Sequence, residues 1–397
     1  MRFHSYLNTA TFIIETYDGT TPLVHHLKHY FAQFKKHGSK DRKLISHLCY
    51  CYFRLGNALQ QLTIAERIKV GLFLCNNEAG VWTVLYDDEL WLNNWKNVLN
   101  ERISFVQQQL PECKLEELFP WQDELSEGVD GTVFSLSHLI QPFLYLRIRP
   151  GFEKTVIQRL RDLDIPFQKI TATSLALANG TKLDDVIRIN TEAVVQDLSS
   201  QSIASFITPE SVQLNWQQQW KVWDCCTASG GKTILLYDLH KKVEFYLSDV
   251  RASMQHQLKQ RLEAAQIHQW KFTTADLTQD NTPFGKHQNF DFIIADVPCT
   301  GSGTWARTPE QIQYFQTEMI EQYATTQKRI VTNVINSLNK GGYLLYITCS
   351  AFKKENEEVV AFIQQNTSLQ LVKMELLKGY NHQADTMFGA LLYKPTV

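Results

Sequence analysis

The sequence predicts an α/β protein with an all-helical N-terminal domain, a small α+β middle domain and a C-terminal domain built on a parallel sheet. Three observations predict this class. Residues 1–125 show helical periodicity with few turn signals, and a short segment of mixed character follows. From about residue 190, short apolar strands alternate with helices, which is typical of a parallel sheet covered on both faces. The chain has 397 residues, 44% of them hydrophobic, which allows a buried core in each domain.

The composition excludes several classes of protein. With 20% charged and 12% aromatic residues the chain is a folded protein rather than a disordered one. No stretch approaches the roughly 20 apolar residues of a membrane helix, and the N-terminus lacks the apolar core of a secretion signal. The eight cysteines include no CxxC pair and no zinc spacing. We therefore expect reduced thiols in a cytoplasmic protein with no metal and no membrane contact.

The N-terminal part combines helical signals with segregated charge. Apolar residues recur at three- and four-residue intervals, Thr63 and Glu66 form a possible capping box, and Gly56 is a plausible helix end. Residues 1–60 carry eight Lys/Arg against three Asp/Glu, whereas residues 61–130 carry five against thirteen. The basic segment is a candidate contact for an anionic partner, and a solvated helical face is the alternative.

The middle part contains short strands and one helix. Residues 143–149 have strand-like content and stop at Pro150-Gly151, after which Val156 and Leu160 indicate a helix. Further short strands are expected around residues 167–170 and 185–189. This part is too short to be a catalytic domain.

In the C-terminal part, strands are expected at four places: 220–224, 243–247, 290–295 and 343–347. Ligands of such sheets bind at the carboxyl ends of the strands. Four acidic residues lie at or near such ends: Asp224, Asp249, Asp276 and Asp296.

A glycine-rich turn follows the first of these strands. Its Gly230-Gly231 pair lets the backbone approach a ligand closely. A phosphate-binding P-loop would need glycine where Cys226 stands. Asp249 closes the next strand, where an acid takes ribose hydroxyls. Asp276, within residues 273–277, stands after a third strand that precedes 290–295, within reach of an adenine edge. We predict an adenosyl ligand, although a strand-end acid that merely caps a helix is the alternative.

Two cysteines lie at strand ends of the same sheet. Cys299 follows the strand at 290–295 in a glycine-rich loop, and Cys349 ends the strand at 343–347. One such cysteine is more often structural than catalytic. Two cysteines at the carboxyl ends of two strands, where ligands bind, are hard to explain by packing alone. Both are therefore candidate catalytic groups.

At these residues the chain resembles the Sun/Fmu family of RNA cytosine-5 methyltransferases, which use S-adenosylmethionine. The family's PGGKT turn, DAPCSGTG loop and TCSxxxxENE segment correspond to residues 229–233, 296–303 and 348–357, and its VQDxxSQ element corresponds to 195–201. The helical front is similar to the NusB-like RNA-binding domain of bacterial ribosomal-RNA members.

The resemblance implies a Rossmann-like methyltransferase sheet and three domains. Residues 1–130 would be a NusB-like RNA-binding domain, 131–205 a small RRM-like α+β domain and 206–397 the catalytic domain. It implies RNA as partner, most simply 16S ribosomal RNA, S-adenosylmethionine as cofactor, and a monomer. The implied cofactor site comprises Cys226, Thr227, Ala228, Ser229, Gly230, Gly231, Lys232, Asp249, Asp276 and Asp296.

The resemblance also implies the catalytic roles. Cys349 would add to carbon 6 of cytosine, Cys299 would assist release of the enzyme, and Asp296 would hold the base near ring nitrogen 3. The base must be accessible, so a single-stranded or flipped nucleotide is expected. Spacing leaves the reverse assignment of the thiols open, with Cys299 attacking as in DNA cytosine methyltransferases.

Other functions remain as alternatives: a tRNA methyltransferase, a catalytically idle RNA-binding assembly factor, and a Rossmann-type oxidoreductase with Asp249 on the ribose. The sequence also departs from the family at three positions. Ser229 replaces the usual proline, Ala306 stands where many members have the first of two arginines, leaving Arg307, and Arg149 stands where asparagine is common. Ala306 and Arg149 belong to regions expected to face RNA.

Overall fold

The computed structural model describes residues 2–280 and 282–396. Met1 and Val397, which begin and end the predicted domains, lie outside the described residues. Within the described part of the chain, no helix is both long enough and apolar enough to span a membrane.

The chain forms two compact units. The helical unit comprises residues Met1–Asp123, Asp130–Gln141 and Trp305–Gln316, and the sheet unit comprises Glu124–Val129, Pro142–Thr304 and Thr317–Val397. The structure divides into these two compact units, and the division into three domains remains a prediction.

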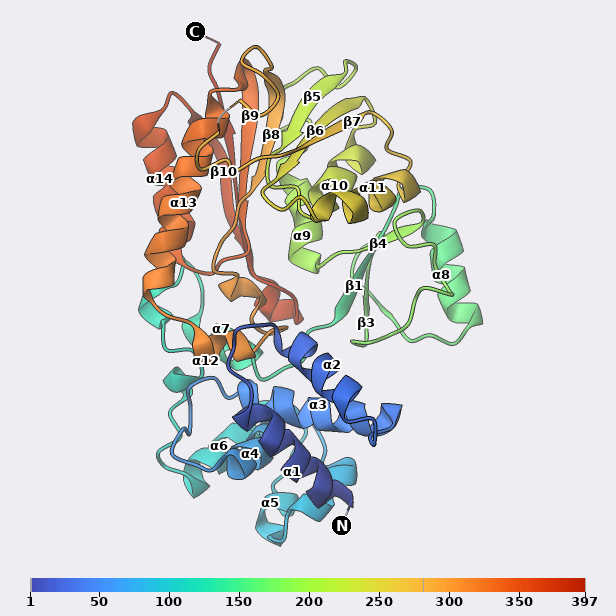
Figure 1. The fold of residues 1–397 in the computed structure, drawn as a ribbon, viewed down its shortest axis with the longest axis vertical. Coiled ribbons are helices and arrows are strands. Elements are labelled where there is room, and N and C mark those ends of the chain that lie inside the picture. Colours follow the sequence, from blue (N-terminus) through green and yellow to red (C-terminus); the bar gives the residue numbers. More distant parts are fainter. Residues whose placement is uncertain (1, 281, 397) are drawn as a thin grey trace. The chain divides into compact units, whose positions relative to one another are not determined.

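The helical unit confirms the all-helical character expected of the N-terminal part (Figure 1). Its α-helices are α1 (Arg2–Glu15), α2 (Leu23–Gln33), α3 (Ser39–Phe53), α4 (Ile64–Cys75), α5 (Glu89–Asn93), α6 (Leu99–Gln109), α7 (Gly131–Ser137) and α12 (Glu310–Tyr314). The expected capping box begins α4, because Thr63 accepts from the Glu66 backbone N–H and Glu66 accepts from that of Thr63. Gly56 adopts a left-handed φ of 53° just after α3.

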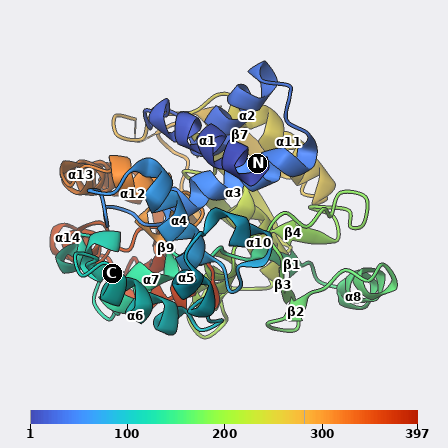
Figure 2. The ribbon, with the colours of Figure 1, turned by 90° about the horizontal axis from the view of Figure 1, so that it is seen from below.

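A four-stranded antiparallel sheet forms the first part of the sheet unit. Its order is β2 (Gln168–Lys169), β3 (Ser174–Leu177), β1 (Leu144–Ile148) and β4 (Ala193–Val195). Helix α8 (Glu153–Asp162) lies beside this sheet (Figures 1 and 2) and contributes Val156 and Leu160 to its core. The short helix α9 (Leu198–Ser202) follows β4.

Residues 185–189, expected to form a strand, do not form one. These residues form turns, and Ile189 makes only an isolated bridge to Ala193. Leu183 and Ile187 are buried in the small core, so their apolar character reflects packing of a loop rather than strand pairing.

The larger sheet has seven strands in the order β10-β11-β9-β8-β5-β6-β7. They are β5 (Trp220–Asp224), β6 (Val243–Asp249), β7 (Trp270–Thr274), β8 (Phe290–Asp296), β9 (Leu338–Thr348), β10 (Gln370–Leu377) and β11 (Met387–Tyr393). The neighbouring strands β9, β8, β5, β6 and β7 are parallel to one another. Strand β11 pairs with β9 in antiparallel fashion, and β10 pairs with β11 in the same way. The predicted Rossmann-like sheet is confirmed, with this antiparallel edge in addition.

Helices cover both faces of the seven-stranded sheet (Figure 1). On one face, α10 (Gly231–Leu239) and α11 (Met254–Ala264) share a core with β5, β6, β8 and β9. On the other, α13 (Glu318–Ile335) and α14 (Glu357–Asn366) pack over alternate residues of the same strands. This alternation is the period of two that a strand imposes, and it leaves the strand ends free to carry polar residues.

Candidate active site

The glycine-rich turn connects β5 to α10 and contains the predicted residues Cys226 to Gly231. Gly230 begins the helix with a left-handed φ of 79°, and a Cβ there would lie 2.7 Å from Leu258 Cδ1. Only glycine fits this position without displacement. A Cβ on Gly231 would meet open space, so the turn is accessible where the helix begins.

Ser229, the departure from the family's proline, has a defined partner. Arg261 on α11 donates hydrogen bonds from Nη1 to the Ser229 hydroxyl at 2.5 Å and to its carbonyl at 2.8 Å. The side chain thereby ties the turn to the neighbouring helix, a restraint that proline would supply through its ring.

Asp249, at the end of β6, lies beside this turn because β5 and β6 are parallel neighbours. Its Oδ2 accepts from the Ala228 backbone N–H at 2.9 Å, and its Oδ1 accepts from the Arg251 backbone and side chain at 2.9 and 3.0 Å. Burial acts to raise the pKa of Asp249, but the bonds from Arg251 outweigh it and the pKa is lowered. The carboxylate is therefore charged at neutral pH.

Asp276 follows β7 and is exposed. Its carboxylate accepts from the backbone and hydroxyl of Thr278 at 3.0 and 2.6 Å and from Gln279 at 2.9 Å. These bonds shape the turn after β7, and the Thr278 bonds lower the pKa of Asp276. The main chain of this turn reaches Asp249, since the Ala275 N–H donates to the Asp249 carbonyl at 3.1 Å.

Lys232 and Asp296 form an ion pair across the edge of the sheet. Lys232, in the first turn of α10, is 9% exposed, and its Nζ donates to Asp296 Oδ2 and to Ser200 Oγ, both at 2.9 Å. Asp296 is the last residue of β8, next to β5 in the sheet. The lysine thus joins the glycine-rich turn to the strand that leads to Cys299.

The structure brings the two cysteines together. β8 and β9 are parallel neighbours, so the loop with Cys299 and the residue after β9, Cys349, lie side by side with their sulfur atoms 3.2 Å apart. Both thiols are half-buried. The hydrogen bond with Cys349 and burial together raise the pKa of Cys299 well above its usual value, so Cys299 is protonated at neutral pH.

Glu355 holds the two cysteine loops against each other, and it is absent from the predicted site. Its side chain is buried and accepts from the backbone and hydroxyl of Thr300, from the Ser350 hydroxyl, and from Gln327 on α13, at 2.5 to 2.9 Å. Thr300 follows Cys299, and Ser350 follows Cys349. The burial of this carboxylate depends on three segments that meet only in the folded chain. In the sequence, the only signal of Glu355 is its place in a short polar motif.

Asp224 is a second group that the predicted site omits. It ends β5, is 1% exposed, and accepts from the Thr233 hydroxyl at 2.6 Å, while its other oxygen has no partner among the described residues. Burial raises its pKa to about 7.

Two of the departures from the family pattern, Arg149 and Ala306, have buried side chains. Arg149 is buried in the sheet unit and pairs with Asp238, and its remaining donors bond to backbone carbonyls. Ala306 is buried in the helical unit. That the regions around these residues face RNA remains a prediction.

Residues 211–393 match the family model of 16S rRNA methyltransferase RsmB/F. Over this stretch the chain is similar to the methyltransferase domain of the RsmB/F family. The resemblance to the Sun/Fmu family is thereby confirmed, whereas the NusB-like nature of the N-terminal part remains a prediction.

Curated relatives of the RsmB/F domain bear the name ribosomal RNA small subunit methyltransferase B. The Xanthomonas campestris protein is 27% identical over 248 residues, which are 57% of this chain and 55% of the relative. The Yersinia enterocolitica protein is 27% identical over 190 residues, which are 48% and 42% of the two chains. The chain spans about half the length of the curated relatives it matches.

Solved structures share the fold of this chain. The structure of PH0851 covers 97% of both chains with a TM-score of 0.68 at 19% identity. NSun6 from Pyrococcus horikoshii with SFG covers 70% of this chain and 98% of that one, with a TM-score of 0.57 at 15% identity. At these identities the likeness shows the fold alone.

Proposed function

We propose that this chain methylates carbon 5 of a cytosine in small-subunit ribosomal RNA with S-adenosylmethionine as methyl donor. The observation that carries the proposal is the pair of thiols from Cys299 and Cys349, 3.2 Å apart at the carboxyl ends of β8 and β9 of a methyltransferase sheet. The names of the curated relatives support ribosomal RNA as the substrate class.

The residues at the sheet edge fit the proposed cofactor. The turn before α10 offers open space at Gly231 and backbone N–H groups at a helix start. Asp249 presents a buried carboxylate beside that turn, in the position where such sheets hold ribose hydroxyls. Bound S-adenosylmethionine would supply an electrophilic methyl group. Lys232 would position Asp296 between the cofactor and the target base.

Carbon 5 of cytosine is too weak a nucleophile to take a methyl group unaided. The Cys349 thiolate adds to carbon 6, which forms a carbon–sulfur bond and shifts electron density to carbon 5. Asp296 binds the base edge at ring nitrogen 3 and stabilises the altered charge of the ring. Once carbon 5 carries the methyl group, a water molecule takes its proton, the carbon–sulfur bond breaks and the thiolate of Cys349 is restored.

Cys299 is proposed to assist this release. Its raised pKa keeps it as a thiol at neutral pH, so it is a poorer nucleophile than a thiolate. The half-buried position of both sulfur atoms also requires the cytosine to leave its stack before it reaches them.

Single cysteine variants test the covalent cycle. Cys349→Ser replaces the thiol by a hydroxyl that ionises far less readily, so no adduct forms and turnover is lost. Cys299→Ser permits attack but slows release, so protein accumulates on RNA. A denaturing gel with labelled ribosomal RNA reads both outcomes, as a shifted band for Cys299→Ser and none for Cys349→Ser.

Cys75→Ser, which removes another half-buried thiol from the helical unit, is the matched control and should resemble the wild type. The opposite band pattern would exchange the roles of the two cysteines. Full activity in both variants would refute covalent catalysis. Bisulfite sequencing of cellular RNA with and without the gene would identify the methylated cytosine and distinguish ribosomal from transfer RNA.

A further inference from the structure

A cavity of ≈ 280 Å³ lies within the sheet unit, lined by residues of β1, β3, α9 and α10. Two residues that line it carry buried polar atoms without hydrogen-bond partners in the described structure: Nη2 of Arg147 and Oγ of Ser174. The residues are 6% and 2% exposed, and they stand directly opposite each other in the antiparallel β1–β3 pair. The two residues that carry these unmet polar atoms therefore line one cavity from the same face of the small sheet.

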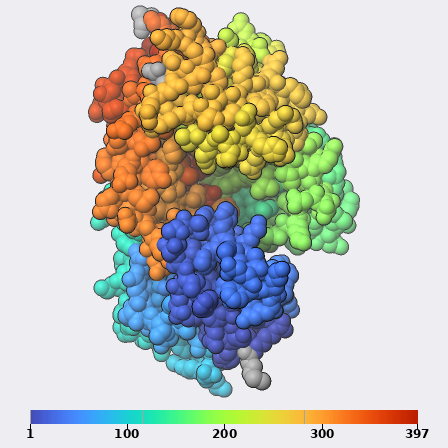
Figure 3. Space-filling view, viewed as in Figure 1, coloured from blue at the N-terminus to red at the C-terminus, as the bar shows by residue number. Residues whose placement is uncertain are grey.

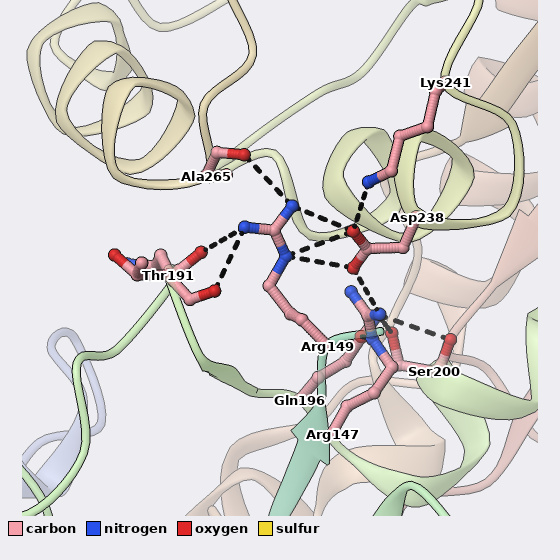
Figure 4. Close-up of polar contacts among 9 residues, drawn as sticks. Arg147, Arg149, Thr191, Gln196, Ser200, Asp238, Lys241 and Ala265 are labelled. Carbon is pink, nitrogen blue, oxygen red and sulfur yellow. Dashed lines mark hydrogen bonds and ion pairs between the residues drawn. The ribbon is translucent and has the colours of Figure 1, made fainter. Parts of the chain in front are cut away.

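Positive charge is in excess beside this cavity. Arg147 Nη1 donates to Asp238 Oδ2 at 2.7 Å (Figure 4). Arg149 donates to the same carboxylate from Nη2 at 2.8 Å and from Nε at 3.1 Å, and Lys241 donates to it at 3.1 Å. Three cations thus share one carboxylate, whose own side chain is 2% exposed. A buried excess charge of this kind is costly unless an opposite charge joins it.

The two arginines differ in how far their donors are used. The remaining N–H groups of Arg149 donate to the backbone carbonyls of Asn190, Thr191 and Ala265. Arg147 keeps Nη2 unpartnered beside the cavity. Burial and the positive charge of Arg147 also lower the pKa of Arg261 on the adjacent helix α11, which agrees with a positive potential in this region.

We propose that the cavity is a binding site for a phosphate-type oxyanion, held by Arg147 Nη2 and the Ser174 hydroxyl. Guanidinium and hydroxyl donors match the oxygen atoms of such a group, and its negative charge balances the cation excess around Asp238. Water would satisfy the two polar groups but would leave the charge uncompensated. The anion is either inorganic phosphate or a phosphate of an RNA backbone, which share this chemistry.

A chain of hydrogen bonds runs from the cavity to the candidate active site. Arg147 Nε donates to Gln196 Oε1 at 2.7 Å, and Gln196 Nε2 donates to Ser200 Oγ at 3.1 Å (Figure 4). Ser200 Oγ in turn accepts from Lys232, the partner of Asp296. In the space-filling view the green surface of the middle part of the chain borders the yellow surface (Figure 3), and Thr191 donates to the Ala264 carbonyl at 3.0 Å. The oxyanion site itself does not depend on the proposed methylation.

Calorimetric titration of the full chain with inorganic phosphate at constant ionic strength tests the site. We expect about one phosphate per chain and at least a fivefold weaker affinity in Ser174→Ala. Ser202→Ala is the matched control, because Ser202 lines the same cavity but its hydroxyl is already bonded to the Leu198 carbonyl at 2.9 Å. That variant should bind phosphate as the wild type does. No phosphate binding by the wild type, or equal loss in both variants, overturns the proposal.

A second arm identifies the source of the anion with octacytidylate RNA as probe. If the site takes a backbone phosphate, the RNA displaces inorganic phosphate and Ser174→Ala weakens RNA binding. If the site takes a free anion, RNA and phosphate bind together and Ser174→Ala leaves RNA affinity unchanged. Either result supports the oxyanion site and names its occupant.

Discussion

At the scale of single residues, the acidic groups of the candidate site differ because their surroundings differ. Asp249 has a lowered pKa because Arg251 and a backbone N–H bond to it, despite its burial. Asp224, at the end of the neighbouring strand, has one hydroxyl partner and a pKa raised to about 7 by burial. The same side chain therefore serves as a fixed charge at one strand end and as a group that titrates near neutral pH at the next.

Asp249→Ala should weaken S-adenosylmethionine binding by roughly 1–3 kcal/mol, about 5- to 150-fold, because ribose hydroxyls lose their acceptor. The substitution also frees the Ala228 N–H of the glycine-rich turn. Calorimetry measures the effect. Glu244→Ala, at the other end of β6, is the control and should bind normally. Unchanged affinity in Asp249→Ala would remove this residue from the cofactor site.

Asp224→Asn should stabilise the protein more at pH 8 than at pH 5. The folded-state pKa of Asp224, about 7, exceeds the ordinary value of 3.8, so its contribution to stability is complete below 3.8 and is lost as pH rises through 7. Asparagine does not ionise and escapes this loss, which is on the order of 1–3 kcal/mol. Thermal unfolding at both pH values measures the difference. An identical shift in Tm at the two pH values would contradict the raised pKa.

At the scale of elements, the site depends on which strands are neighbours. The parallel pair β8–β9 sets Cys299 beside Cys349, and the parallel pair β5–β6 sets the glycine-rich turn beside Asp249. Glu355 then bonds to the loops after β8 and β9 and to α13. The burial of these bonds makes the loop arrangement cooperative, since removal of one acceptor leaves several donors unmet.

Glu355→Gln should lower the amount of covalent RNA adduct formed in a Cys299→Ser background at least tenfold. Glutamine replaces one carboxylate oxygen by an N–H₂ group, so either the hydroxyls of Thr300 and Ser350 or the N–H donors of Thr300 and Gln327 lose their acceptor, and the cysteine loops move apart. The denaturing gel measures the adduct, and thermal unfolding shows whether the fold persists. Glu357→Gln is the matched control, because Glu357 accepts from Ser126 and Glu127 rather than from the cysteine loops. Equal adduct in both variants would reduce Glu355 to a packing role.

At the scale of the whole molecule, the two compact units exchange segments of chain. Residues 305–316 lie in the sequence of the methyltransferase domain, yet they belong to the helical unit. There Glu310 accepts from the Leu23 N–H at 3.1 Å, and Tyr314 donates to the Tyr17 carbonyl at 2.8 Å. A Cβ on Gly19 would overlap the Tyr314 ring, so this approach requires glycine. The helical unit is therefore complete only when the C-terminal half of the chain is present.

The basic N-terminal segment gives a prediction for the whole chain. Lys35, Lys36, Lys40 and Lys43 are exposed, whereas Arg42 is half-buried and donates to the His37 carbonyl at 2.8 Å. Changing the four lysines to glutamine should flatten the plot of log affinity for RNA against log salt by up to about 0.7 for each phosphate that the chain no longer neutralises. Filter binding across a salt series measures the slope. The control makes the same change at four other exposed lysines: Lys182, Lys242, Lys286 and Lys340. An equal slope in both variants would mean that the basic segment is a solvated helical face that does not bind RNA.

The sequence by itself determined the local features of this protein: the capping box at Thr63, the turn at Gly230, and the strand ends that carry Asp249, Asp296, Cys299 and Cys349. These follow from periodicity and turn chemistry, which act over a few residues. Only the tertiary structure decided that Glu355 joins the cysteine loops, that Arg149 is buried against Asp238, and that Tyr314 packs in the helical unit. These features depend on burial and on partners tens to hundreds of residues away, and side-chain type alone does not reveal either.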